Sequence, residues 1–187
     1  MPSSFPLTSS VGRESGKASL SGLPWSERGG RALWVCSRAR FHTSRSTVTR
    51  RGSGLPIDRV VLDSWAWWEV LQDSPVGRRI ARSYLESPGV RALTVDLAMA
   101  EVSAKLARMG RLDLIARSTQ TMEELSEILP ISRGVAEGTG PVLLRLRGRD
   151  SHASLADAVM LAAARSVDAS LVSDDPCYRG EADVLQS

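Results

Sequence analysis

The pattern of apolar and polar positions along the chain changes sharply near residue 55. Beyond that point, short β-branched runs alternate with stretches in which apolar residues recur about every three to four positions. The short runs are typical of buried strands. The strands expected are Ile57–Leu62, Arg91–Thr94, Ile128–Ile131, Ala169–Ser173 and, at an edge, Ala182–Leu185.

Helices are expected between these strands. The pattern predicts them at Ser64–Gln72, Pro75–Leu85, Leu97–Met109, Glu123–Glu127, Ser132–Arg145 and Leu155–Arg165. The fifth contains Gly-Thr-Gly-Pro at 138–141, so its continuity stays open. Strands that alternate with helices predict an α/β domain, with a mostly parallel sheet covered by helices on both faces.

The first 54 residues show no such period and are rich in Ser, Gly and Arg. This composition predicts a disordered basic extension, residues 1–54, followed from Leu55-Pro56 by one domain, residues 55–187. Three specific roles remain open: a tail that contacts RNA phosphates, an organelle transit peptide, or a stretch translated from a start placed too early. A segment without a folded function is the favoured interpretation.

The charge of the chain is divided unevenly between these two parts. Residues 1–54 hold nine Lys or Arg and two Glu, whereas residues 55–187 hold fifteen Lys or Arg and nineteen Asp or Glu. The predicted domain is therefore acidic and lacks a broad basic field for nucleic acid. Local contacts would have to hold an RNA, and the candidates, which are ordinarily solvated surface residues, are Arg78, Arg79, Arg82 and Arg108.

Composition narrows the chemistry further. No stretch approaches the roughly 20 apolar residues that cross a bilayer, so no membrane span is expected. Cys36 and Cys177 suggest neither a disulfide framework nor a zinc site, which makes a reducing cytoplasm the expected location. With only His42 and His152 available, oxygen ligands would hold any metal, and these favour Mg²⁺ or Mn²⁺.

Two acids directly follow predicted strands. Asp63 closes the first strand, and Asp175 follows the strand Ala169–Ser173. The carboxyl ends of parallel strands meet at one edge of a sheet, where sites form. Each acid also has a local explanation, because Asp63 can cap a helix and Asp175 can shape the turn before Pro176.

Two further acids lie on predicted helices. Asp157 stands three residues after Ser154 at the start of an apolar helix, which is also the spacing of a capping box. Glu101 interrupts a helix whose apolar residues face the core, and pairing with Lys105 would explain it locally. A carboxylate on a mostly buried helix needs a partner, and a metal would supply one.

Taken together, the four acids and their surroundings resemble the PIN-domain nucleases, closest to the VapC toxins. VVLDSWAWWEVL resembles the opening of VapC-type members, AEVSAKLARMG their Glu-bearing helix, and SLADAVMLAAARSVDASLVSDDPCY their closing helix–strand–Asp segment. The resemblance covers Ile57–Leu185. The family's strand usually ends Thr-x-Asp, whereas this chain has Ser173, Asp174 and Asp175, and Tyr178 stands where a Phe is common.

The resemblance implies a three-layer α/β/α fold with four or five strands. It also implies one or two Mg²⁺ or Mn²⁺ ions in an acidic cluster. Asp63 and Asp157 would bind the metal directly, and Glu101 and Asp175 would act through water. Ser173 could add a hydrogen bond and Asp174 a second carboxylate.

The function implied is that of a metal-dependent endoribonuclease, the toxin of a type II pair, with a cognate antitoxin and a homodimeric state. The alternatives are an RNA-processing nuclease without antitoxin, an inactive PIN-fold binding module, and a phosphatase. Three tryptophans, Trp65, Trp67 and Trp68, can stack on bases or pack in a core or dimer interface, and packing is favoured.

Overall fold

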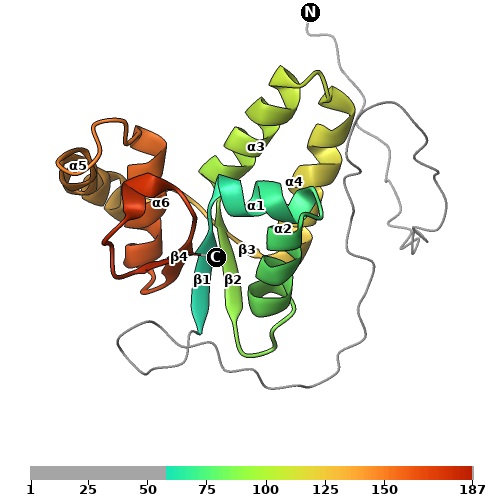
Figure 1. The fold of residues 1–187 in the computed structure, drawn as a ribbon, viewed down its shortest axis with the longest axis horizontal. Helices are drawn as coiled ribbons and strands as arrows, with labels where there is room; N and C mark the ends of the chain where they lie inside the picture. Colours follow the sequence, from blue (N-terminus) through green and yellow to red (C-terminus); the bar gives the residue numbers. More distant parts are fainter. Residues whose placement is uncertain (1–57, 187) are drawn as a thin grey trace, which may run out of the picture. The chain divides into compact units, whose positions relative to one another are not determined.

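The computed structural model describes residues 58–186, so the predicted extension 1–54 and Ile57 lie outside the described part. Five parallel strands form one sheet in the order β3-β2-β1-β4-β5 (Figure 1). The strands are β1 (Arg59–Leu62), β2 (Arg91–Val95), β3 (Glu127–Leu129), β4 (Ser170–Val172) and β5 (Val184–Leu185). The predicted parallel sheet and its edge strand are confirmed.

Helices lie on both sides of this sheet. They are α1 (Ser64–Leu71), α2 (Pro75–Ile80) with its π-helical continuation (Ala81–Leu85), α3 (Asp96–Arg108), α4 (Ile115–Leu125), α5 (Arg133–Arg147) and α6 (Leu155–Ser166). Short 3₁₀ turns occur at Leu112–Leu114 and Pro176–Tyr178. Helices α1 to α4 lie on one side of β1 and β2, and α5 and α6 on the other (Figure 1).

The strand order explains this division into layers. From β1 the chain first adds β2 and β3 in one direction, and then returns to add β4 and β5 on the opposite side of β1. Because crossovers between parallel strands are right-handed, reversing the direction moves the connecting helices to the other face. The reversal also opens a crevice at the carboxyl ends of β1 and β4, where sites in such sheets form.

The central strand is buried on both faces. Val60, Val61 and Leu62 have no exposed surface, which is why β1 reads as a continuous apolar run and not as an alternating one. Trp67 is also fully buried, and its Nε1 donates to Thr94 Oγ1 at 2.8 Å. The packing interpretation therefore holds for Trp67, which no base can reach.

Helix α4 corrects the sequence prediction. The expected helix began at Glu123, whereas α4 begins at Ile115, and Glu127 belongs to β3. Two of the residues that α4 buries are the polar Ser118 and Thr121, so the apolar period is hidden. Small hydroxyl side chains enter the interior without an unpaired donor because they can donate to the preceding turn.

Helix α5 settles the question that segment 138–141 left open. The helix is continuous from Arg133 to Arg147 with Pro141 inside it. Gly138 lies against α6, where an added Cβ would stand 3.9 Å from Ala162 Cβ. Packing against α6 compensates for the hydrogen bond that Pro141 cannot donate.

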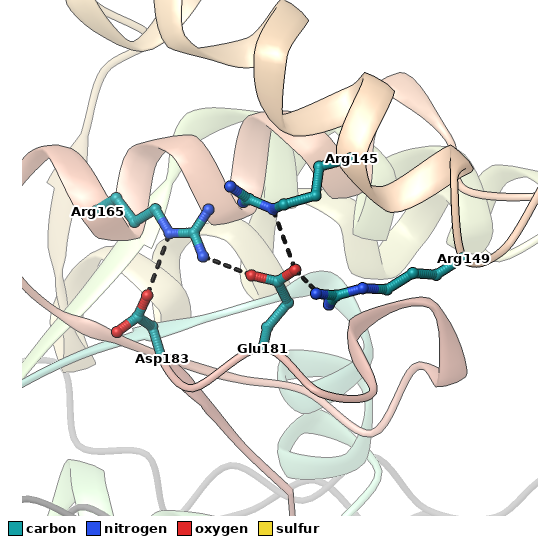
Figure 2. Close-up of polar contacts among 5 residues, drawn as sticks. All are labelled: Arg145, Arg149, Arg165, Glu181 and Asp183. Carbon is teal, nitrogen blue, oxygen red and sulfur yellow. Dashed lines mark hydrogen bonds and ion pairs between the residues drawn. The ribbon is translucent and has the colours of Figure 1, made fainter.

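A buried carboxylate joins the ends of α5 and α6 to the segment before β5. Figure 2 shows Glu181 facing Arg145, Arg149 and Arg165, while Arg165 also contacts Asp183 at 3.1 Å. The Glu181 side chain is only 4% exposed, whereas the three arginines are 29–48% exposed. These contacts fix the chain between the end of β4 and β5.

We expect Glu181→Ala to destabilise the protein by about 2–3 kcal/mol, because it removes a buried acceptor of several charge-assisted hydrogen bonds. Glu137→Ala is the matched control, since Glu137 pairs with Arg133 on the surface and exposed pairs contribute about 0.5 kcal/mol. Equilibrium urea unfolding measures both variants. Equal losses in the two would contradict a structural role for the Glu181 cluster.

Candidate metal centre

Asp63 lies at the reversal point of the sheet. It directly follows β1 and caps α1, with its Oδ1 accepting from Ala66 N at 2.7 Å. Its own backbone N–H donates to Val172 O of β4 at 3.3 Å, and its carboxylate is hydrogen-bonded to the side chain of Ser173. The Asp63 residue is only 6% exposed. A potentially charged group is therefore held in the interior, between the ends of β1 and β4.

Burial raises the pKa of Asp63 from 3.8 to about 7. The neighbouring charges of Glu101 and Asp175 raise the pKa further, while the hydrogen bonds from Ser173 and Ala66 lower it. Near neutral pH, Asp63 therefore carries a proton for much of the time unless a cation is present.

Glu101 reaches the same region from α3. It is half-buried and hydrogen-bonded to the side chain of Ser64. Burial is the largest cause that raises its pKa, and the charge of Asp157 adds to it, against the lowering effect of Ser64. Lys105 lies 3.9 Å from the centroid of the Trp68 ring, so the local explanation by pairing with Glu101 is wrong.

Asp157 combines a local role with a place in the cluster. Its Oδ2 accepts from Ser154 N at 2.7 Å, and its own N–H donates to Ser154 Oγ at 3.1 Å, which forms the expected capping box. The potential ligand atoms of Asp157, Asp175 and Cys177 nevertheless lie within 4.8 Å of one another.

Asp175 shows the same combination. Its Oδ1 accepts from Cys177 N at 2.9 Å, which begins the 3₁₀ turn Pro176–Tyr178. Its backbone N–H donates to Ser173 Oγ at 3.2 Å, so one hydroxyl serves both Asp63 and Asp175. The local and the functional interpretation of this acid are compatible.

The structure therefore brings together all four acids that the sequence singled out. Asp63 faces the charges of Glu101 and Asp175, and Asp157 faces those of Glu101 and Asp175. Three of them also cap the starts of helical segments, whose N–H groups offset negative charge. What remains uncompensated is a negative cluster with oxygen donors, the donor type that Mg²⁺ and Mn²⁺ prefer.

Sequence reasoning missed some residues around this cluster and named others that lie apart from it. Ser64 and Cys177 belong to the cluster by the contacts above, and Tyr178 O–H donates to Asp157 O at 3.0 Å. Asp174 is exposed and forms no hydrogen bond with these acids within residues 58–186. Only the tertiary structure reveals the role of Ser64, because its partner Glu101 lies on another helix.

The four arginines considered as RNA contacts are exposed. Arg78 is bound to the backbone carbonyl and the carboxylate of Asp73, which neutralises part of its charge. Within residues 58–186, no helix combines the length and the apolar character that crossing a bilayer requires.

An α/β/α protein with an acidic cluster at the reversal point of a parallel sheet is built for metal-assisted chemistry on phosphate. The family model for the PIN domain matches residues 60–179, and the chain therefore belongs to the PIN-domain family. The resemblance stated from the sequence is confirmed. PIN domains are nucleases that generally use divalent metal ions, so the activity class is hydrolysis of nucleic acid.

Solved structures share this fold. VapBC2 from Rickettsia felis, bound to a promoter DNA fragment, has a TM-score of 0.57 at 10% identity, covering 69% of this chain and 97% of that one. FitAcB from Neisseria gonorrhoeae has a TM-score of 0.53 at 21% identity, covering 68% and 95%. No curated protein sequence matches the chain significantly. At these identities the likeness shows the fold alone.

Proposed function

We propose that this protein is a metal-dependent endoribonuclease that hydrolyses RNA phosphodiester bonds. The observation that carries the proposal is the convergence of four acids on one site, with Asp63 buried and its pKa raised to about 7. Such a cluster destabilises the folded chain unless a cation or protons compensate it. A protein that served only as a scaffold would gain nothing from this cost.

The four acids divide the work of holding an ion and handling water. Asp63 and Asp157 bind Mg²⁺ or Mn²⁺ directly, while Glu101 and Asp175 act through water. A bound divalent ion supplies Lewis-acid chemistry, which activates water and offsets charge on the phosphate. Glu101, with its raised pKa, accepts a proton from the attacking water. Ser173 orients the carboxylate of Asp63.

We further propose that the protein is the toxin of a type II pair and acts in the cytoplasm as a homodimer. Its fold neighbours include VapBC2 and FitAcB, and a separate neighbour is titled a toxin–antitoxin complex. A cognate antitoxin would silence the site by placing a basic side chain among the four acids. An RNA-processing nuclease without an antitoxin is the alternative that shares the same chemistry.

The test is cleavage of a mixed RNA pool by the full chain with Mg²⁺, Mn²⁺ or EDTA. We expect cleavage with either metal, none in EDTA, and a loss of about 100-fold or more in Asp157→Asn, because one direct ligand is removed. Asn can still accept the capping hydrogen bond from Ser154, so the fold should persist. Glu123→Gln, which changes an exposed acid on α4, is the matched control and should cleave normally.

Two outcomes would count against the proposal. Equal cleavage by Asp157→Asn and wild type would place the chemistry elsewhere. Absence of both cleavage and calorimetric Mg²⁺ or Mn²⁺ binding in the wild type would leave a PIN-fold binding module.

A further inference from the structure

Cys177 places a sulfur atom inside the acidic cluster. Its Sγ and the carboxylate oxygens of Asp157 and Asp175 lie within 4.8 Å of one another. The residue is 3% exposed, and its thiol is free. The predicted cluster had only oxygen ligands, so this sulfur changes which ions the site can hold.

The turn that carries Cys177 is held in place at both ends. Asp175 N–H donates to Ser173 Oγ at 3.2 Å, and Cys177 N–H donates to Asp175 Oδ1 at 2.9 Å. Tyr178, which is 2% exposed, donates its O–H to Asp157 O at 3.0 Å and so ties the turn to the start of α6. The thiol is therefore kept beside both carboxylates by hydrogen bonds that do not involve the sulfur.

The spacing suits a small tetrahedral ion. Zinc binds sulfur at about 2.3 Å and carboxylate oxygen at about 2.1 Å, so ligand atoms that share one ion lie roughly 3.6 Å apart. Side-chain rotations of about 1 Å would bring the three ligand atoms from their present spacing to this value. Magnesium prefers oxygen and octahedral geometry, and would leave the sulfur unused.

We propose that Cys177, together with Asp157 and Asp175, binds a borderline-soft ion such as Zn²⁺ or Co²⁺ through its sulfur, and that the site therefore prefers these ions to Mg²⁺. The inference rests on the proposed function, because Asp157 and Asp175 are acids of that site. Binding breaks the S–H bond, forms the metal–sulfur bond and releases the proton to water. Thiolate ligands select such ions, whereas carboxylates alone suit Mg²⁺ and Mn²⁺.

Titration of the full chain with Co²⁺ tests this inference without measuring activity. A thiolate bound to Co²⁺ produces a charge-transfer absorption band in the near ultraviolet, which oxygen ligands do not. We expect the wild type to show the band and Cys177→Ser to lose it, with Co²⁺ affinity weakened on the order of 100-fold. Excess Mg²⁺ at equal concentration should not displace Co²⁺ from the wild type.

Cys36→Ser is the matched control, since it removes the other cysteine and leaves Cys177, and it should keep the band. Calorimetric Co²⁺ binding by the wild type without a band, or a band that persists in Cys177→Ser, overturns the sulfur ligand while leaving the carboxylate site intact. Absence of binding by Co²⁺, Mg²⁺ and Mn²⁺ alike overturns both the sulfur ligand and the metal-dependent function. The wild-type spectrum decides the question even if Cys177→Ser fails to fold.

Discussion

Replacing Asp63 by Asn is expected to abolish RNA cleavage and, at the same time, to stabilise the metal-free protein. Asn keeps the shape of the side chain, and its amide oxygen can still accept from Ala66 N. It cannot provide a charged ligand, so we expect cleavage to fall by about 1000-fold. Function and stability should therefore move in opposite directions, as is common where a site is kept under strain.

The stability gain should depend on pH. Because the folded protein raises the pKa of Asp63 from 3.8 to about 7, the folded state binds the proton more tightly than the unfolded chain. The stability contributed by protonated Asp63 is thus complete below about pH 4 and is lost as the pH rises to about 7. In the absence of metal, Asp63→Asn should exceed wild type by about 4 kcal/mol above that range and by little below it.

Urea unfolding in EDTA across this pH range measures the effect, and RNA cleavage with Mn²⁺ measures the activity. Asp58→Asn is the matched control, because Asp58 is exposed just before the opposite end of β1. It should change neither stability nor cleavage. A metal-free Asp63→Asn protein that is no more stable than wild type above pH 7 would show that burial of this carboxylate carries no cost.

The second large effect is expected at Gly77, where α2 crosses α1. A Cβ added at Gly77 would lie 2.0 Å from Glu69 O and 2.6 Å from Val70 N, which are backbone atoms of α1. Backbone cannot rotate away as a flexible side chain can, so the two helices would have to separate. We expect Gly77→Ala to destabilise the protein by about 3 kcal/mol or more, despite the better helix propensity of Ala.

Gly140→Ala provides the comparison. Gly140 is an exposed helical glycine in α5, and an added Cβ meets nothing within 4 Å. Here the higher helix propensity of Ala should stabilise the protein by up to about 1 kcal/mol. Thermal and urea unfolding of both variants measure the difference. Loss of stability in both, or in neither, would contradict the close approach of α1 and α2 at Gly77.

The sequence predicted most elements because each showed its own local signal. The β-branched run of β1 and the apolar period of α6 are examples, and each reports burial directly. Helix α4 lacked that signal, since it buries Ser118 and Thr121 beside Met122. Hydroxyl groups that donate to their own helix behave as buried residues without appearing apolar, so their burial is visible only in the fold.

The candidate site divides in the same way. The acids Asp63, Glu101, Asp157 and Asp175 were identifiable because each stands at a strand end or on an apolar helix. The roles of Ser64 and Cys177 were not, because their partners come from other elements. The sequence pattern places an acid on an element, but it does not specify which side chains from other elements lie around it.

By itself, the sequence determined the order of strands and helices, the acids available for a metal and the family to which the chain belongs. Only the tertiary structure decided that Asp63 loses its water and titrates near neutral pH, that Cys177 joins two of the acids, and that Glu181 faces three arginines. The physical reason is that secondary structure follows from neighbours along the chain. Desolvation and Coulomb energy instead depend on distances between residues that folding alone brings together.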